Sequence, residues 1–146
     1  MKSLLHRALD LLAMREHSSL ELQRKLVNKG FEKNEVEALI ATLLEEGLLN
    51  DARFAEMFVR FKANAGQGPR RIEMELQQKG VVGSLIGEYL AQQDWQACIE
   101  DVWLRKYGET NEVLTQQEKQ KRVRFLTQRG FESAAIYAVM RERCKT

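Results

Sequence analysis

Proline, cysteine and aromatic residues are scarce in this chain of 146 residues. It contains one proline and two cysteines, Cys98 and Cys144, and aromatic residues make up 8% of it. Two cysteines without a CxxC or Cys/His spacing exclude a disulfide framework and a zinc site built on cysteines. Because proline breaks helices, its scarcity favours helical structure, as does the abundance of Leu, Ala, Glu, Lys, Arg and Gln.

Long apolar runs are also missing. No run approaches the roughly 20 residues that a membrane-spanning helix needs, and the first residues lack the apolar stretch of a signal peptide. Together with the two isolated thiols, this predicts a protein of the reducing cytoplasm.

The motifs of catalysis are absent as well. There is no GxxxxGK[ST] phosphate loop and no GxSxG nucleophile elbow, and His6 and His17 lack the spacing of metal ligands. We expect both histidines to be surface or capping residues. The sequence therefore predicts no enzyme, no cofactor and no metal site.

An internal repeat organises the chain. The segment Leu26-Val27-Asn28-Lys29-Gly30 recurs as Leu76-Gln77-Gln78-Lys79-Gly80 and again as Leu126-Thr127-Gln128-Arg129-Gly130, 50 residues apart each time. A glycine after the last helical residue adopts the left-handed turn that ends a helix. Each copy therefore marks the end of one helix in a repeated unit.

Each repeat is predicted to contain three helices. Apolar residues at three- and four-residue spacing predict first helices over 4–15, 51–64 and 95–107. Second helices are expected to start at Ser18, Pro69 and Thr115, and third helices to cover 32–46, 84–93 and 133–143. Ser18 and Thr115 begin capping boxes, and proline is tolerated at a first helical position.

The middle repeat departs from the pattern in its third helix. Gly83 and Gly87 lie at its start and in its first turns, and each costs about 1 kcal/mol relative to alanine, so we expect this helix to be short. The predicted fold is all-α, an elongated, curved array of three tandem three-helix repeats with a period of about 50 residues. Their expected boundaries are 1–49, 50–94 and 95–146.

The overall formal charge of +2 hides an alternation along the chain. By segment, the net charge is +3 for residues 1–29, −5 for 30–56, +3 for 57–81, −5 for 82–118 and +6 for 119–146. The second helices are therefore basic, and the regions around the first two third helices are acidic.

The outer faces of the second helices carry the candidate binding residues. With Leu26, Leu76 and Leu126 facing the core, the positions two before and two after each leucine point outward. Cations there suit phosphates or acidic protein surfaces. The candidates on and near these faces are Arg24, Lys25, Lys29, Arg70, Arg71, Lys79, Lys121, Arg122, Arg124 and Arg129.

Two other interpretations of these cations stay open. A charged helix face is often only solvated. Lys29, Lys79 and Arg129 lie in last helical turns, where cations complement the helix dipole, so these three are also explained by folding alone.

Several ordered blocks resemble the bacterial RecX family of recombination regulators. They begin with Arg15-Glu16-His17-Ser18-x-x-Glu21-Leu22-x-x-Lys25-Leu26-x-x-Lys29-Gly30-Phe31 and continue with Gly47-Leu48-Leu49-Asn50-Asp51-x-Arg53-Phe54-Ala55. The most distinctive is Gly66-x-Gly68-Pro69-x-Arg71-Ile72-x-x-Glu75-Leu76-x-x-Lys79-Gly80, and two more cover 105–109 and 124–131. Together these blocks cover nearly the whole chain.

The resemblance implies a function that composition alone does not. RecX-like proteins are built of tandem three-helix repeats, and they bind RecA, chiefly in the groove of its filament on DNA. They suppress its ATP hydrolysis, strand exchange and coprotease activity, without a catalytic residue or cofactor of their own. For this chain the resemblance implies a regulator of homologous recombination, DNA repair and the SOS response. A monomer is the default expectation, and we expect at most weak contact with single- or double-stranded DNA.

Two other functions remain open at this point. Short helices at this spacing also suit a direct DNA-binding regulator of the helix-turn-helix kind, with the basic second helices in a groove. A structural array with unrelated protein partners is the other alternative.

Overall fold

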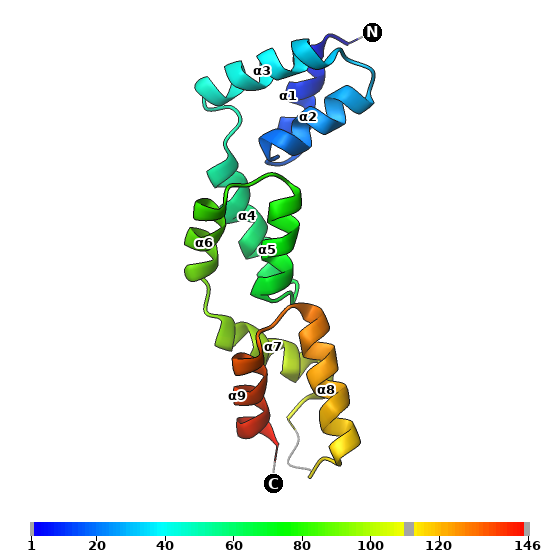
Figure 1. Ribbon diagram of the computed structural model, residues 1–146, viewed down its shortest axis with the longest axis vertical. Coiled ribbons are helices and arrows are strands. Elements are labelled where there is room, and N and C mark those ends of the chain that lie inside the picture. Colours follow the sequence, from blue (N-terminus) through cyan, green and yellow to red (C-terminus); the bar gives the residue numbers. More distant parts are fainter. Residues whose placement is uncertain (1, 110–112, 145–146) are drawn as a thin grey trace. The chain divides into compact units, whose positions relative to one another are not determined.

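The protein is described here by a computed structural model, in which residues 2–109 and 113–144 are placed. These residues form nine α-helices and no β-strand (Figure 1). Their bounds are α1 Leu4–Met14, α2 Ser19–Asn28, α3 Lys33–Glu45, α4 Asp51–Asn64, α5 Pro69–Gln78, α6 Gly83–Ala91, α7 Trp95–Tyr107, α8 Gln116–Arg129 and α9 Ser133–Arg143. Within the described ranges, no helix combines the length and the apolar character needed to cross a membrane.

The helices confirm the predicted pattern of three helices in each repeat. Ser18 and Thr115 cap α2 and α8, and both capping boxes are complete. In the first, the Ser18 hydroxyl accepts a hydrogen bond from the Glu21 amide at 3.1 Å, while the Glu21 carboxylate accepts one from the Ser18 amide at 3.4 Å. The middle second helix begins at Pro69, as expected.

Helix α6 is the shortest of those described, with nine residues against 13 in α3 and 11 in α9. It begins at Gly83 and contains Gly87, and a Cβ atom at either position would meet no other group within 4 Å. Close packing therefore does not require these two glycines. They weaken the helix without a compensating contact.

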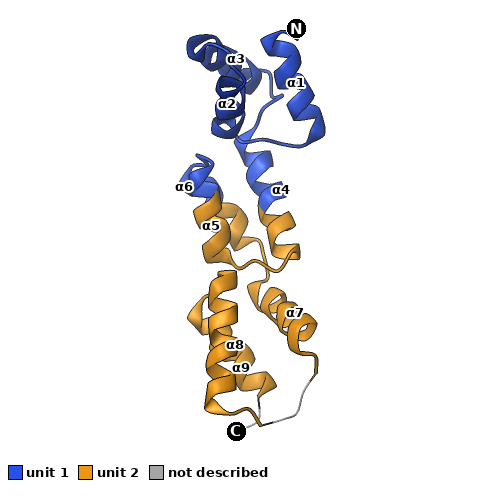
Figure 2. Ribbon diagram, turned by 90° about the vertical axis from the view of Figure 1, so that its right-hand side faces the viewer, with its two compact units in different colours: residues 1–58, 76–87 blue, residues 59–75, 88–146 orange. Residues whose placement is uncertain are grey.

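The chain divides into two compact units, residues 1–58 with 76–87 and residues 59–75 with 88–146 (Figure 2). The first unit has a core of small and aliphatic side chains from α1, α2, α3 and the turn after α3, formed by Ala8, Leu22, Leu26, Val36, Ile40, Leu43 and Leu49. The core of the second unit lies among α7, α8 and α9 and consists of Ile99, Val102, Trp103, Leu126, Phe131, Ile136, Val139 and Met140.

Within the first unit, the end of α5 docks on the start of α2. The Ser18 hydroxyl donates a hydrogen bond to the Lys79 carbonyl oxygen at 2.8 Å. Gly80 lies so close to α2 that a Cβ atom there would stand 2.7 Å from the side chain of Leu20. The glycine that ends α5 is therefore also a packing residue between the first two repeats.

Within the second unit, the end of α8 docks on the start of α5 in the same way. The Gly68 amide donates to the Arg129 carbonyl oxygen at 2.7 Å, and the Arg70 amide donates to the Gly130 carbonyl oxygen at 2.9 Å. A Cβ atom at Gly68 would overlap the backbone of Gly130 and Phe131. Backbone therefore meets backbone at this junction.

The two junctions follow one rule. In each, a group at the start of a second helix donates to the carbonyl that lies 61 residues further along the chain. The positive end of one helix dipole thus meets the negative end of another. Among the residues that the structure describes, the first copy of the motif, Lys29-Gly30, makes no such contact, and a Cβ atom at Gly30 would meet nothing within 4 Å.

A matched pair of glycine substitutions separates backbone strain from docking. Gly30 and Gly130 have nearly equal φ angles of +100° and +101°, but only at Gly130 would a Cβ atom stand 2.5 Å from the Cβ of Arg71. We expect Gly30→Ala to cost about 1–2 kcal/mol of unfolding free energy through strain alone. Gly130→Ala should cost a further ~1–3 kcal/mol because it also forces the junction apart.

Urea denaturation of both variants and the parent protein provides the measurement. Equal losses for Gly30→Ala and Gly130→Ala would show that the close approach at Gly130 does not hold the repeats together.

Candidate partner-binding surface

The second helices present the predicted outward faces. Leu26, Leu76 and Leu126 are fully buried. The positions two before and two after each leucine are all exposed, and they are occupied by Arg24, Asn28, Met74, Gln78, Arg124 and Gln128. The helical wheel drawn from the sequence is therefore confirmed for the exposure of these residues.

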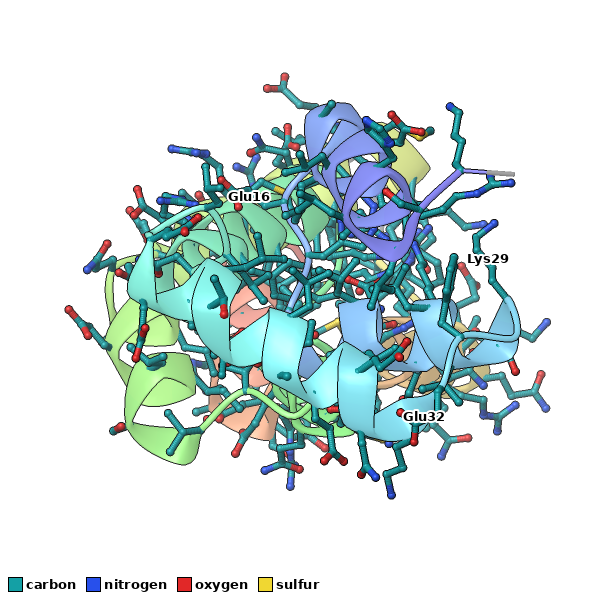
Figure 3. The ribbon with its side chains drawn as sticks, turned by 90° about the horizontal axis from the view of Figure 1, so that it is seen from above. Glu16, Lys29 and Glu32 are labelled. Carbon is teal, nitrogen blue, oxygen red and sulfur yellow. The ribbon has the colours of Figure 1, made fainter. Side chains whose placement is uncertain are left out.

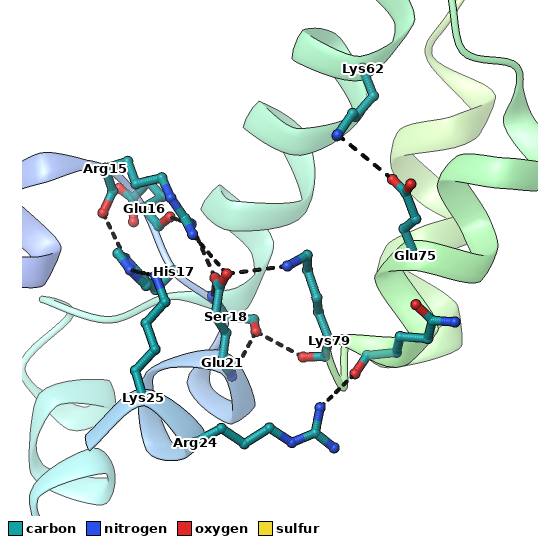
Figure 4. A network of polar contacts seen from close by, with 11 residues as sticks. Arg15, Glu16, His17, Ser18, Glu21, Arg24, Lys25, Lys62, Glu75 and Lys79 are labelled. Atoms are coloured by element: carbon teal, nitrogen blue, oxygen red, sulfur yellow. Dashed lines mark hydrogen bonds and ion pairs between the residues drawn. The ribbon is translucent and has the colours of Figure 1, made fainter. Parts of the chain in front are cut away.

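Glu21 lies at the centre of the junction between the first two repeats (Figure 4). Its carboxylate accepts Arg15 Nη2 at 2.7 Å and Lys79 Nζ at 3.2 Å, and its side chain is only 9% exposed. Burial on its own would raise the pKa of Glu21, but the hydrogen bonds from Arg15 and Lys79 outweigh it and lower this pKa to about 2. Lys79, a predicted binding residue, thus has its charge paired inside the fold.

His17 is buried beside this carboxylate, so it is not a surface histidine. Its Nε2 lies 3.0 Å from Lys25 Nζ and its Nδ1 lies 3.0 Å from the Arg15 carbonyl oxygen. An ammonium group has only donors, so Nε2 accepts and Nδ1 carries the proton. Burial, assisted by the nearby charges of Arg15 and Lys25, lowers the pKa of His17 and keeps the ring neutral.

Arg24 joins the same junction from the outer face of α2. Its Nη1 donates to the Gln78 carbonyl oxygen at 3.1 Å (Figure 4). Arg24 is therefore exposed and at the same time anchored to the end of α5.

In the second unit, Lys62 and Glu75 form a separate ion pair at 4.0 Å, which is also drawn in Figure 4.

Two cations of α8 are likewise engaged within the fold. The Arg122 guanidinium lies over the rings of Tyr107 at 4.0 Å and Trp103 at 4.9 Å. That of Arg129 lies 5.3 Å from the ring of Phe125, while its carbonyl oxygen accepts the bond from Gly68. Such cation–π contacts fix both side chains against aromatic faces.

The other candidate cations stay exposed on their helices. Lys29 lies at the periphery of Figure 3, by the turn between α2 and α3. Arg71 is exposed and lies 3.6 Å from Glu75 of its own helix. The exposed set consists of Arg24, Lys29, Arg70, Arg71, Lys121 and Arg124. Among the residues that the structure describes, neither Lys121 nor Arg124 has an ion-pair partner.

Sequence reasoning did not find a groove that lies between α8 and α9. Lys119, Tyr137 and Arg141 line it together with Arg124. The net charge of +6 over residues 119–146 was the available signal. That charge does not reveal which cations share a hollow, because this depends on how α9 packs against α8.

The chemistry available on these surfaces is charge pairing and hydrogen bonding. Within the described part of the chain, no three His, Cys, Asp or Glu side chains are grouped so that they would hold a metal ion. The exposed groups are mostly guanidinium, ammonium and amide groups, which suit carboxylates and phosphates.

The repeated three-helix units and their glycine junctions define an all-α tandem-repeat protein. Family models described as the first, second and third three-helix domains of RecX match residues 5–43, 50–90 and 92–140. The chain belongs to the RecX family. It is similar to proteins named Regulatory protein RecX, so its relatives are regulators by name rather than enzymes.

Two relatives illustrate how far the similarity extends. The protein of Pseudomonas entomophila (strain L48) is 41% identical over 131 residues, which cover 88% of this chain and 84% of the relative. That of Halorhodospira halophila (strain DSM 244 / SL1) is 41% identical over 133 residues, which cover 90% and 82%.

Solved structures share the fold. One, described as the crystal structure of regulatory protein RecX, gives a TM-score of 0.76 at 25% identity and covers 95% of this chain and 70% of its own. The crystal structure of RecX from Lactobacillus salivarius gives 0.74 at 21% identity, with coverage of 94% and 92%. The second likeness bears on the fold alone.

The first junction should weaken in acid because of Glu21. The pKa of Glu21 is about 2 in the folded protein, below its value in an unfolded chain, so its ionised form stabilises the fold above about pH 4.5. That contribution is lost as the pH falls toward 2. We expect Glu21→Gln to lower the unfolding free energy by about 1–3 kcal/mol at pH 7, and the difference from the parent protein to shrink at pH 3.

Denaturation at the two pH values measures this effect. Glu45→Gln is the control, because Glu45 is exposed at the end of α3. A difference for Glu21→Gln that is the same at both pH values would contradict the assigned role of the carboxylate.

Proposed function

We propose that this protein binds the RecA filament on DNA along its groove and inhibits RecA ATPase, strand exchange and coprotease activity. It thereby modulates homologous recombination, DNA repair and the SOS response. Membership of the RecX family supports this proposal. The observation that carries it is the set of cations that remain exposed on the second helices, apart from those whose side chains are engaged within the fold.

The alternation of charge favours a filament over bare DNA as the partner. Exposed cations lie on α2, α5 and α8, whereas exposed carboxylates such as Glu35, Glu37 and Glu45 lie on α3. A surface that binds DNA alone is usually continuously positive, since each phosphate repels a carboxylate. A nucleoprotein filament offers acidic and basic protein groups as well as phosphates.

The proposed mechanism is mechanical. Repeats that contact neighbouring RecA subunits restrict the movements of the filament, cap its growth or hasten its disassembly, and they need no chemistry of their own. We take residues 1–49, 50–94 and 95–146 as the three contacting repeats of a monomer that acts in the cytoplasm.

The direct test is a titration of the purified protein into RecA on single-stranded DNA while ATP hydrolysis is followed. Inhibition that saturates supports the proposal. An unchanged ATPase rate at saturating protein would overturn it and would favour a scaffold array with other partners.

A salt series separates the filament from DNA as the partner. Affinity for duplex DNA is measured with and without RecA at several salt concentrations, because phosphate contacts weaken steeply with salt. Tight, sequence-selective binding to duplex without RecA would instead identify a direct DNA-binding regulator.

The exposed cations should control inhibition without controlling stability. Replacing Arg71, Lys121 and Arg124 together by alanine removes three charges from exposed positions on α5 and α8. We expect the concentration that halves RecA ATPase activity to rise at least tenfold, which corresponds to about 1.4 kcal/mol of binding free energy. Helicity and the melting temperature should stay nearly unchanged.

A matched triple variant controls for net charge. Lys2, Lys33 and Arg105 have side chains that are 58%, 70% and 61% exposed, and none lies on a second helix. Their replacement by alanine should leave inhibition within about twofold of the parent protein, since all three lie off the proposed binding faces of the second helices. An equal loss of inhibition in the two triple variants would mean that inhibition depends only on the total charge of the protein.

A further inference from the structure

The groove between α8 and α9 has a volume of about 640 Å³, which is in the range of binding pockets in proteins. The two helices pack side by side in the second unit (Figure 1). Val123 and Met140 form the apolar part of its lining together with Cys144. Tyr137 adds an aromatic side chain that is 52% exposed.

Among the described residues, every charged residue that lines this groove is a cation. Lys119 and Arg124 come from α8 and Arg141 comes from α9, and the remaining polar lining is Gln116 and Gln120. Within the described part of the chain, none of the three cations forms an ion pair. The groove therefore combines an apolar lining with uncompensated positive charge.

We propose that this groove docks an acidic, amphipathic segment of a protein partner. Apolar side chains of the segment pack on Val123, Tyr137 and Met140, while its carboxylates pair with Lys119, Arg124 and Arg141. Both parts of the lining are then used, and each cation gains an acceptor. Helical segments that lie in apolar grooves are a common mode of peptide recognition.

A nucleic-acid strand fits the groove less well. A phosphodiester chain offers anions to the three cations, but its backbone offers no apolar group to the apolar part of the lining. Strands are usually held by several aromatic residues on which successive bases stack, and Tyr137 is the one aromatic residue among the described residues of the lining. An acidic amphipathic protein segment offers both carboxylates and apolar side chains to the groove, whereas a nucleic-acid strand offers mainly its charge.

This inference does not depend on the identity of the filament partner proposed above. Of the residues named there as binding cations, only Arg124 contributes to the groove. A protein that fails to inhibit RecA can still dock an acidic segment here, and the two results are measured separately.

The probe is a fluorescein-labelled peptide of 12 residues in which Leu and Phe occupy one helical face and Glu and Asp the other. Two peptides of the same length serve as comparisons, one with serine in place of the apolar residues and one with lysine in place of the acidic ones. Fluorescence anisotropy with the full chain should show the first peptide binding at least tenfold more tightly than either comparison.

Matched variants locate the binding. Arg141→Glu should weaken it at least fivefold, whereas Arg143→Glu, the same change two residues along α9 and outside the groove, should change it less than twofold. Tyr137→Ala should weaken it at least tenfold, whereas Phe61→Ala, which removes an aromatic side chain that is 64% exposed on α4, should have no effect. Circular dichroism verifies that each variant is folded.

Three results would overturn the proposal. The first is absence of binding, and the second is equal binding of the acidic peptide and its serine counterpart, which would leave charge as the sole attraction. The third is displacement of the peptide by oligothymidylate at a lower concentration than by unlabelled peptide, which would assign the groove to nucleic acid.

Discussion

The contact between the end of one second helix and the start of another holds successive repeats together. Each junction depends on a hydrogen bond to the last carbonyls of a helix, of 2.8 Å from Ser18 and of 2.7 Å from Gly68. Each also depends on a glycine that lets the two helix ends approach. A three-helix unit buries too little surface to be stable alone, so this contact decides whether the repeats act together.

The same contact determines which cations remain available to a partner. The repeated pair of a cation and a glycine looks, in the sequence, like a binding motif copied three times. In the structure Lys79 pairs with Glu21, and Arg129 provides a carbonyl to Gly68 and stacks on Phe125. Only Lys29, whose glycine docks on nothing, is left exposed. The same sequence motif thus has a structural role in the second and third repeats, whereas in the first repeat its cation stays exposed to a partner.

The fold was largely predictable because its signals are local. Capping boxes at Ser18 and Thr115, proline at the start of α5 and glycines in α6 all act within a few residues. The uses of the candidate residues were not predictable in the same way. The burial of His17, the pairing of Glu21 with Lys79 and the groove beside Tyr137 depend on how separate helices pack. A helical wheel shows which side chains point outward, but it does not show what they meet.

The two junctions differ in the kind of atoms that join them. Ionisable side chains reinforce the first, where Glu21 must stay charged and His17 must stay neutral beside Lys25. The second is joined by main-chain groups of Gly68, Arg70, Arg129 and Gly130, which do not titrate. We therefore expect acid to weaken the first junction and to leave the main-chain hydrogen bonds of the second unaffected. The response of the repeat contacts to acid is thus set by which junction contains ionisable side chains, and that junction is the one nearer the amino-terminal end.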